Sequence, residues 1–405
     1  MDSLWDVVVV GAGPAGASAA ISARRARPDA RVLLLDRDDF PRDKSCGDGI
    51  APQVLDVLAS VGVVGIESGY AGVDRLRIGF ASGPATVGVM ARAAYVIPRE
   101  IFDARLVQAA LHRGVELRRH RVRTVAVADD ACHLVLDDRV RARVVIAADG
   151  ASSVIRRQVA PRRIRASSWP PDLPLPWRSR PIPPGSRGRH TAVAIRGYAP
   201  APARRAGEQV IVFADPHRGG GSSWPAYAWS FPIGDGRANI GYGELFRPGR
   251  PLTRQQLLQH LEELLPGAGT GARSWRAHLL PLSTGRPRQP DGRILFAGDA
   301  MNLINPITGE GIFYAVASGV LAGRAAVESG DPGRGYRASL RRALGVHLRH
   351  TDAAVLLARS PTVVASAVRA ADRHQGTFDD LVELGLGDGR LTASVLRGIA
   401  AALLR

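Results

Sequence analysis

Residues 11–16 of the sequence, Gly-Ala-Gly-Pro-Ala-Gly, have the composition and spacing of a loop that binds phosphate groups. In such a loop Gly11 allows a tight turn, and Gly13 lets the backbone approach a pyrophosphate. Gly16 lets the following helix pack closely against a strand. The chemistry that this motif indicates is therefore the binding of a dinucleotide.

The elements that must position this loop flank it directly. Residues 7–10 are four valines and predict a buried parallel strand, and residues 17–27 predict a helix whose first N–H groups would face the phosphates. A second strand over 31–35 ends at Asp36, whose carboxylate would accept hydrogen bonds from a ribose. Since an Asp there disfavours a 2′-phosphate, the pattern predicts FAD or NAD rather than NADP. No second motif of this kind follows a strand, which favours a resident cofactor.

Two later strands end in acidic loops. Residues 144–148 lead into Asp149, and residues 294–297 lead through Gly298 into Asp299, after which we predict a helix over 312–327. The carboxyl ends of strands are where open α/β sheets bind their ligands, so both loops are expected to face a ligand.

Three motifs together resemble those of the FAD-dependent aromatic hydroxylases and their relatives: GxGxxG at 11–16, DGxxSxxR at 149–156 and GDAxxxxxPxxGEG at 298–311. The resemblance implies that FAD is bound, with Asp299 on its ribityl chain. It also implies that the backbone at Gly311 and Ile312 faces the N1–C2=O edge of the isoalloxazine. A helix N-terminus there would stabilise the negative charge of a reduced flavin.

Further stretches narrow the resemblance to the geranylgeranyl reductase family. They are PRDKSCGDG at 41–49, REIFD at 99–103, YAWSFP at 227–232 followed by ANIGYG at 238–243, and NPITGEGI at 305–312. By this resemblance Arg99 contacts FAD. The full set of predicted cofactor-binding residues is Gly11, Gly13, Ala15, Gly16, Asp36, Arg37, Lys44, Cys46, Gly47, Gly49, Arg99, Val122, Asp149, Gly298, Asp299, Pro306, Gly309, Gly311 and Ile312.

Cys46, Tyr227 and Trp229 are the candidate catalytic residues. Cys46 lies near the flavin by resemblance and could donate a proton there, although a free cysteine is commonly a small buried hydrophobe. Trp229 and Phe231 alternate on a predicted strand and could fill the core. By the resemblance they could instead line an apolar substrate tunnel near the flavin. Tyr227 falls on the same face and carries a hydroxyl group. The ten histidines form no ligand pattern, and we predict no metal site.

The predicted fold is α/β, with a Rossmann-like FAD-binding domain, an inserted antiparallel β-sheet domain for substrate, and C-terminal helices. The FAD-binding domain is expected to comprise residues 1–75, 99–160 and 285–330, and the substrate domain residues 76–98 and 161–284. The C-terminal region 331–405 is expected to be helical over 340–357, 363–371 and 391–404. The last of these helices would pack on the protein or lie on a membrane face.

The leading hypothesis is a reductase, in which reduced flavin delivers hydride to a C=C bond of an apolar, prenyl-like substrate. A proton would follow from Cys46, a tyrosine or water. The alternative is a monooxygenase that uses NAD(P)H and O₂ to hydroxylate an aromatic or polyketide-like ring. In both cases NAD(P)H or another reductant is the expected electron donor. A flavin halogenase would place a lysine between flavin and substrate, and the one lysine, Lys44, lies in another motif.

Composition bounds the class of protein and its partners. The chain has 405 residues, of which 45% are hydrophobic and 22% charged, and this excludes a disordered or fibrous chain. The formal net charge of +17 raises nucleic acid or an anionic membrane as a partner. The arginines that produce it are dispersed and no motif that reads nucleic acid accompanies them, so we expect an apolar small-molecule substrate and no nucleic acid.

The cysteine count bounds the compartment. Cys46 and Cys132 are the two cysteines, too few for a disulfide framework, which favours a reducing, cytoplasmic compartment. No stretch reaches the roughly 18 apolar residues of a membrane span, so any membrane contact would be peripheral. The sequence predicts no oligomeric state.

Overall fold

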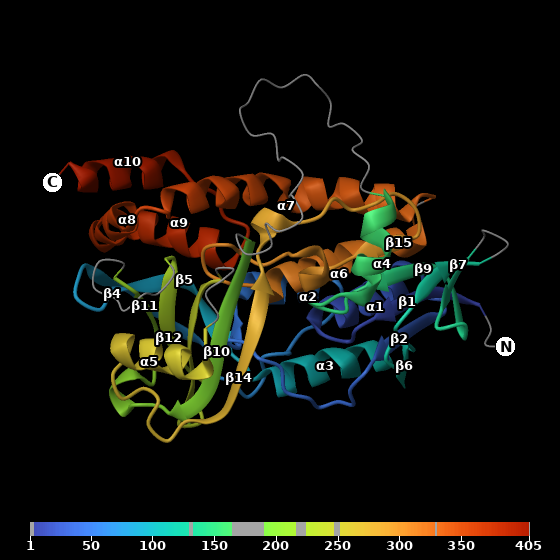
Figure 1. The fold of residues 1–405 in the computed structure, drawn as a ribbon, viewed down its shortest axis with the longest axis horizontal. Coiled ribbons are helices and arrows are strands. Elements are labelled where there is room, and N and C mark those ends of the chain that lie inside the picture. Colours follow the sequence, from blue (N-terminus) through green and yellow to red (C-terminus); the bar gives the residue numbers. More distant parts are fainter. Residues whose placement is uncertain are drawn as a thin grey trace.

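The computed structural model describes residues 4–128, 133–163, 190–215, 224–246, 252–328 and 330–404. Cys132, in the predicted FAD-binding domain, lies outside these ranges. Residues 164–189, in the predicted substrate domain, also lie outside them. The described residues form two sheets with helices packed against them (Figure 1).

The first sheet is the predicted Rossmann-like one. Its strand order is β6-β2-β1-β9-β8-β7, with β15 beside β9. Five strands run parallel, namely β1 (Trp5–Val10), β2 (Val32–Asp36), β6 (Glu116–Arg119), β9 (Val140–Ala147) and β15 (Ile294–Phe296), whereas β7 (Val125–Val127) and β8 (Leu134–Leu136) are antiparallel. The four predicted strands of this sheet are confirmed. Their carboxyl ends meet at one edge, which brings the loops after β1, β2, β9 and β15 together.

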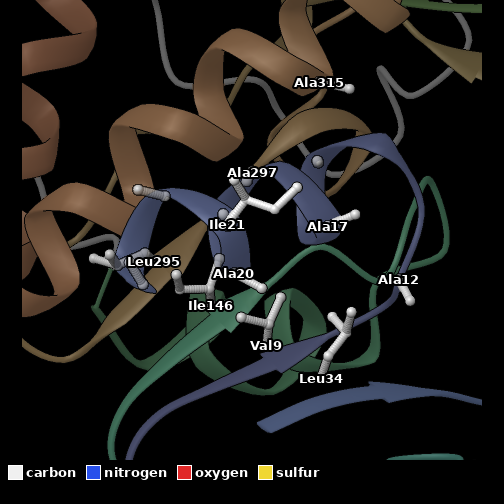
Figure 2. Packing of buried hydrophobic residues seen from close by; sticks show 14 of the residues in the cluster. Val9, Ala12, Ala17, Ala20, Ile21, Leu34, Ile146, Leu295, Ala297 and Ala315 are labelled. Carbon is white, nitrogen blue, oxygen red and sulfur yellow. The ribbon is translucent and has the colours of Figure 1, made fainter. Parts of the chain in front are cut away.

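α1 (Pro14–Ala26) and α6 (Ile312–Glu328) pack on this sheet, and small residues let the two helices approach each other closely. α3 (Arg99–Leu111) packs on α1 and α2 (Pro52–Ser60) on α6, while α4 (Val154–Arg163) follows β9. Figure 2 shows Ala17, Ala20 and Ile21 of α1 beside Val9, Ile146 and Leu295 of the sheet. On the other side of α1, a Cβ at Gly323 of α6 would lie 2.0 Å from the carbonyl oxygen of Ala19. The phosphate loop thus leads into a helix that packs against both the sheet and α6.

The second sheet has eight strands in the order β14-β10-β13-β12-β11-β4-β5-β3. They are β3 (Gly49–Ile50), β4 (Val73–Phe80), β5 (Ala85–Val96), β10 (Thr191–Pro200), β11 (Glu208–Phe213), β12 (Ala226–Pro232), β13 (Arg237–Leu245) and β14 (Arg273–Pro281). The prediction of an antiparallel sheet is wrong at one pair, because β11 and β4 run parallel. These two strands are joined through α3 and the first sheet rather than by a hairpin, and only a short hairpin forces antiparallel pairing.

The two faces of the second sheet are covered by different helices. α5 (Arg254–Leu264) packs on β10, β12 and β13, whereas α8 (Pro361–Arg373) and α9 (Gln375–Leu386) pack on β4 and β5 (Figure 1). α7 (Pro332–Leu357) and α10 (Ala393–Leu403) complete the C-terminal group. Within the described ranges, short 3₁₀ segments occur at Ala203–Arg205, Ser283–Gly285 and Gly298–Met301. Of the C-terminal helices, α7, α8 and α10 were predicted. α9 lies within the region that was expected to be helical, but it was not predicted as a separate helix.

The described helices were also compared with the length and hydropathy of a membrane span. No single one is long and apolar enough to cross a membrane. α7 and α8 satisfy the criterion only as a pair, and they are bent by 115° at their junction.

The close approach of α1 and α6 gives a first prediction. Gly323→Ala would force a methyl group against the Ala19 carbonyl, so α6 must move away from α1, and we expect the free energy of unfolding to fall by about 1–3 kcal/mol. Urea unfolding followed by circular dichroism measures this. Gly345→Ala on α7 is the control, because there the nearest other atom is the flexible side chain of Arg341 at 3.3 Å. It should leave stability unchanged or raise it by up to about 1 kcal/mol, and equal losses in both variants would contradict the packing.

Candidate active site

The phosphate loop has the geometry that its sequence predicts. Gly11 has a φ of +98°, and a Cβ at Gly16 would lie 1.7 Å from the Gly11 carbonyl oxygen. Gly13 caps α1 without a side-chain hydrogen bond, and the first turn of α1 contains no acidic residue. The first N–H groups of α1 therefore point toward the loop with no internal partner, which is an anion-binding arrangement.

Asp36, at the end of β2, is held beside this loop. Its Oδ2 accepts a hydrogen bond from the Ala12 N–H at 2.7 Å, and its Oδ1 accepts one from the Asp38 N–H at 3.0 Å. Each carboxylate oxygen keeps a further lone pair, so the side chain can still accept from a ribose. Arg37 is exposed beside it, and the buried Val122 follows β6.

Asp149 and Arg156, the two ends of the DGxxSxxR motif, make hydrogen bonds to backbone groups of the site. Oδ2 of Asp149 accepts from the Val154 N–H at 2.7 Å and so begins α4, while its Oδ1 is buried without a partner in the described residues. Arg156, at the end of the same motif, donates to the carbonyl oxygens of Ala300 at 2.7 Å and Asp299 at 3.3 Å. Arg156 thereby fixes the loop that carries Asp299.

Lys44 and Asp299 form an ion pair across the site. The Lys44 Nζ lies 3.2 Å from Oδ2 of Asp299. Burial alone would raise the pKa of Asp299, but Lys44 and the nearby His278 hold it below its usual value. The pKa of His278 is lowered by burial and by Lys44, and its Nε2 has no partner in the described residues.

Arg99 is a buried cation at the start of α3. Its guanidinium makes two hydrogen bonds to the carboxylate of Asp103, at 2.6 and 2.7 Å, and Arg42 reaches the same carboxylate at 3.2 Å. Burial opposes the charge on Arg99, whereas Asp103 restores it and raises the pKa above the usual value. Arg42 also lies 3.7 Å from Oδ2 of Asp36, so the two arginines are balanced by two carboxylates beside the phosphate loop.

The loop that precedes α6 is tied to the C-terminal helices. The Asn305 side-chain amide donates to the carbonyls of Leu384 and Gly385, and the Thr308 hydroxyl donates to Gly385 at 2.6 Å. Glu310 accepts from the Phe313 N–H at 2.8 Å, and burial raises the pKa of its carboxyl to about 7. The hydrogen bonds from Asn305 and Thr308 therefore attach the loop before α6 to the end of α9.

One large cavity, of about 350 Å³, joins these parts. At one end it is lined by predicted cofactor and catalytic residues, namely Lys44, Cys46, Gly47, Gly49, Arg99, Tyr227, Trp229, Asp299, Pro306, Gly309, Gly311 and Ile312. At the other end its walls are apolar and come from β4, β11 and the C-terminal helices, including Leu76, Ile78, Ile211, Val364, Val368 and Phe378. The other predicted cofactor residues do not line it. Ala15 and Gly16 lie in the first turn of α1, and the rest lie at or just after strand ends of the first sheet, namely Gly11, Gly13, Asp36, Arg37, Val122, Asp149 and Gly298.

A row of aromatic rings forms one side of the cavity. Tyr227, Trp229 and Phe231 follow each other along β12, with ring centroids 5.9 and 6.4 Å apart. Trp229 needs Gly241 beneath it, because a Cβ there would lie 2.2 Å from the indole ring. The Tyr227 hydroxyl donates to the Thr308 carbonyl, and burial raises the pKa of this phenol. Trp229 and Phe231 thus line the cavity, and Trp229 is also buried core.

Cys46 faces the same cavity and is half-buried. Burial raises the pKa of its thiol, against the opposing field of Arg99. The thiol is therefore neutral at ordinary pH, a state in which it can hold a proton but is a poor nucleophile.

Several side chains at this site were not predicted from the sequence. They are Arg42, Asp48, Arg156, Arg196, Tyr198, Asn239, His278 and Glu310. Five of them lie inside the motifs that carry the family resemblance, and that position was a usable signal: Arg42, Asp48, Arg156, Asn239 and Glu310. Arg196, Tyr198 and His278 lie on β10 and β14, where nothing in the local sequence distinguishes them from ordinary strand residues.

The hydrogen-bonding groups at the strand ends fit FAD. The uncapped helix start suits a pyrophosphate, Asp36 suits a ribose, and the buried, unpartnered Oδ1 of Asp149 leaves an acceptor beside the strand ends. Lys44 and Asp299 stand between these groups and the aromatic row. The individual cofactor contacts and the roles of Cys46, Tyr227 and Trp229 stay predictions.

Comparison with known proteins agrees with this arrangement. A sequence model of the FAD binding domain matches residues 5–169. The chain is 31% identical over 351 residues to the menaquinone reductase of Mycolicibacterium smegmatis, covering 80% of this chain and 76% of that protein. It is 32% identical over 346 residues to digeranylgeranylglycerophospholipid reductase 1 of Methanopyrus kandleri, covering 80% and 81%. A geranylgeranyl bacteriochlorophyll reductase-like structure from Thermoplasma acidophilum has the same fold, with a TM-score of 0.66, 20% identity, and coverage of 98% and 96%.

The ion pair between Lys44 and Asp299 gives a second prediction. Lys44→Met leaves a buried carboxylate without its cation, and we expect the affinity for FAD to fall about 10-fold or more, equivalent to 1.4 kcal/mol. Lys44→Arg keeps the charge and should lose less. Quenching of flavin fluorescence on titration into apoprotein measures both. Arg341→Met, which removes one exposed charge on α7, is the control; an equal effect of Lys44→Met and Arg341→Met would mean that the pair is incidental.

Proposed function

Because the chain belongs to the geranylgeranyl reductase family of FAD-dependent oxidoreductases, we propose that it saturates C=C bonds in the isoprenoid chain of an apolar substrate. When bound, the flavin supplies the hydride for such a reduction. The observation that carries the proposal is the single cavity that continues from the predicted flavin residues into an apolar passage.

The residues that line the passage favour an apolar chain. The passage runs between the β4 and β11 face of the second sheet and the helices α8, α9 and α10, and its walls carry aliphatic side chains such as Leu381, Val382 and Ile399. An isoprenoid tail in this passage would be removed from water along its length, at about 25 cal/mol for each Å² of apolar surface buried. An aromatic substrate would fill only the part beside the aromatic row.

The relatives favour the same substrate class. They are named as a menaquinone reductase and as digeranylgeranylglycerophospholipid reductases, whose substrates differ in the head group and share an isoprenoid chain. The feature that such substrates have in common is thus the part that the passage fits. NAD(P)H or another reductant is proposed as the electron donor, since the chain has one dinucleotide-binding motif and FAD is expected to occupy it.

The chain's own residues would orient the substrate and exclude water. Trp229 and Phe231 offer flat apolar surfaces against which a planar C=C bond can lie. The α6 N-terminus at Ile312 stabilises negative charge at the flavin end of the cavity. The Tyr227 hydroxyl, engaged with the Thr308 carbonyl, fixes β12 to that loop and is not free to donate elsewhere.

A peripheral contact with a membrane would deliver such a substrate. Val395, Ile399 and Ala402 of α10 are buried against the protein, whereas Leu396 and Leu403 on its other face are exposed. The predicted packing of this helix is compatible with a membrane contact, because different faces serve the two purposes.

The proposed reaction is tested directly in a single turnover. Enzyme with chemically reduced FAD, mixed without oxygen with a polyprenyl substrate, should reoxidise its flavin and yield a product that is heavier by two hydrogen atoms for each bond reduced. Absorbance of the flavin and mass spectrometry of the lipid give the two readouts. A product that forms only with oxygen and contains an oxygen atom would identify a monooxygenase instead.

The passage itself gives a further prediction. Ala367→Phe, on the cavity side of α8, narrows the passage, so turnover should fall about 10-fold or more with long isoprenoid chains and remain near wild type with short ones. Ala365→Phe is the matched control, because Ala365 is also half-buried on α8 but does not line the cavity. Equal turnover of all chain lengths by Ala367→Phe would show that the chain lies elsewhere.

A further inference from the structure

Asp48 is a buried acidic residue in the wall of the cavity. It is fully inaccessible to solvent and lines the cavity beside Cys46. Its Oδ2 accepts hydrogen bonds from the Tyr198 hydroxyl at 2.6 Å and from the Asn239 amide at 2.8 Å. Its Oδ1 has no partner among the described residues.

This pattern of hydrogen bonds suits a protonated carboxyl group. Both donors address one oxygen, which fits the carbonyl oxygen of a neutral acid, and the proton then resides on Oδ1. An ionised carboxylate would leave one charged oxygen buried without a donor, which is costly. Burial raises the pKa of Asp48 to about 6, against the opposing effects of Tyr198, Asn239, Arg196 and Arg99.

The surroundings hold the carboxyl group in place and connect it to solvent. Asp48 has a φ of +61°, in the left-handed region, and the Asn239 amide also donates to the Cys46 carbonyl at 2.8 Å. The oxygen of the same Asn239 amide accepts from the Trp229 indole at 2.9 Å, which fixes Asp48 relative to the aromatic row. Tyr198 is only half-buried, and the guanidinium of the exposed Arg237 lies 5.8 Å from its ring. Tyr198 is therefore the partly exposed side chain that contacts the buried acid.

We propose that Asp48 is the proton donor of the reduction and that Tyr198 carries its replacement proton from solvent. The inference rests on the proposed function. The π bond of the substrate breaks, the hydride of the reduced flavin forms one new C–H bond, and the proton that leaves Oδ1 of Asp48 forms the other. The flavin is oxidised in this step. As the Tyr198 hydroxyl takes a proton from solvent, it passes its own proton to Oδ2, the oxygen that it contacts. Rotation of the carboxyl group about its Cβ–Cγ bond then returns the protonated oxygen to the Oδ1 position.

The positions of Cys46 and Asp48 also indicate which of the two residues donates the proton. Burial keeps the Cys46 thiol neutral, and ionising it would place a second negative charge beside Asp48, which raises the pKa of the thiol further. Cys46 therefore lines the cavity with a small, uncharged side chain. Asp48 is the group whose proton can be lost and regained near neutral pH.

The decisive variant is Asp48→Asn, which is isosteric and suits the left-handed backbone, where Asn is readily accepted. In anaerobic single turnovers of reduced enzyme with a polyprenyl substrate, we expect it to slow flavin reoxidation about 100-fold or more. The wild-type rate should fall as pH rises through about 6, because only the protonated acid donates, and Asp48→Asn should lose this dependence. Asp29→Asn, an exposed carboxylate after α1, should behave as wild type.

Two further variants separate Asp48 from its neighbours. Tyr198→Phe removes a hydrogen bond that favours the charged form, so it should move the pH dependence upward. Cys46→Ala should retain the pH dependence; its loss would make Cys46 the donor and overturn the proposal.

A readout without turnover completes the test. In oxidised holoenzyme, the infrared difference between wild type and Asp48→Asn should contain the band of a protonated carboxylic acid, which disappears as pH rises through about 6. An Asp48 that is already ionised well below that pH, or an Asp48→Asn enzyme with the wild-type rate and pH profile, would overturn the proposal alone. A wild-type enzyme that saturates no polyprenyl substrate would overturn the proposed function and this inference together.

Discussion

The site depends on one crossing segment, residues 41–49, which leaves the first sheet after β2 and ends as β3 in the second sheet. A buried arginine holds it there. Arg196 on β10, with 1% of its surface exposed, donates to the Asp43 carboxylate and to the Lys44 carbonyl at 3.1 Å. A buried guanidinium is tolerated only where acceptors surround it, so the segment cannot shift without leaving this charge unpaired. The ion pair of Lys44 with Asp299 fixes its other side to the first sheet.

This arrangement brings the groups suited to the cofactor and the apolar side chains suited to the substrate into the lining of one cavity. Groups suited to an anionic, redox-active cofactor come from the strand ends of the first sheet, and apolar rings and aliphatic side chains come from the second sheet and the C-terminal helices. The loop at Asn305 and Thr308 joins the two through its contacts with α9. The helices that enclose the apolar passage are thus mechanically connected to the loop that faces the flavin end.

Much of this could be predicted from local sequence patterns, because strand, glycine loop and helix follow each other directly in the Rossmann-like half. The parallel pairing of β4 and β11 could not, since no local pattern encodes which distant strands become neighbours. The same limit applies to Arg196 and Tyr198, whose partners Asp43 and Asp48 lie about 150 residues away. Asp48 was within a recognised motif, but its burial and its single unpartnered oxygen exist only in three dimensions. The individual roles of the predicted site residues remain predictions.

The central claim is that an isoprenoid chain occupies the apolar passage while its C=C bond lies beside the flavin. A crystal structure of the FAD complex with a saturated long-chain isoprenoid product measures this most directly. We expect continuous density from the aromatic row at Trp229 to the side chains of α8 near Val368, with the chain between the second sheet and the C-terminal helices. A chain that lies outside this passage, or a passage closed by side chains when FAD is bound, would contradict it.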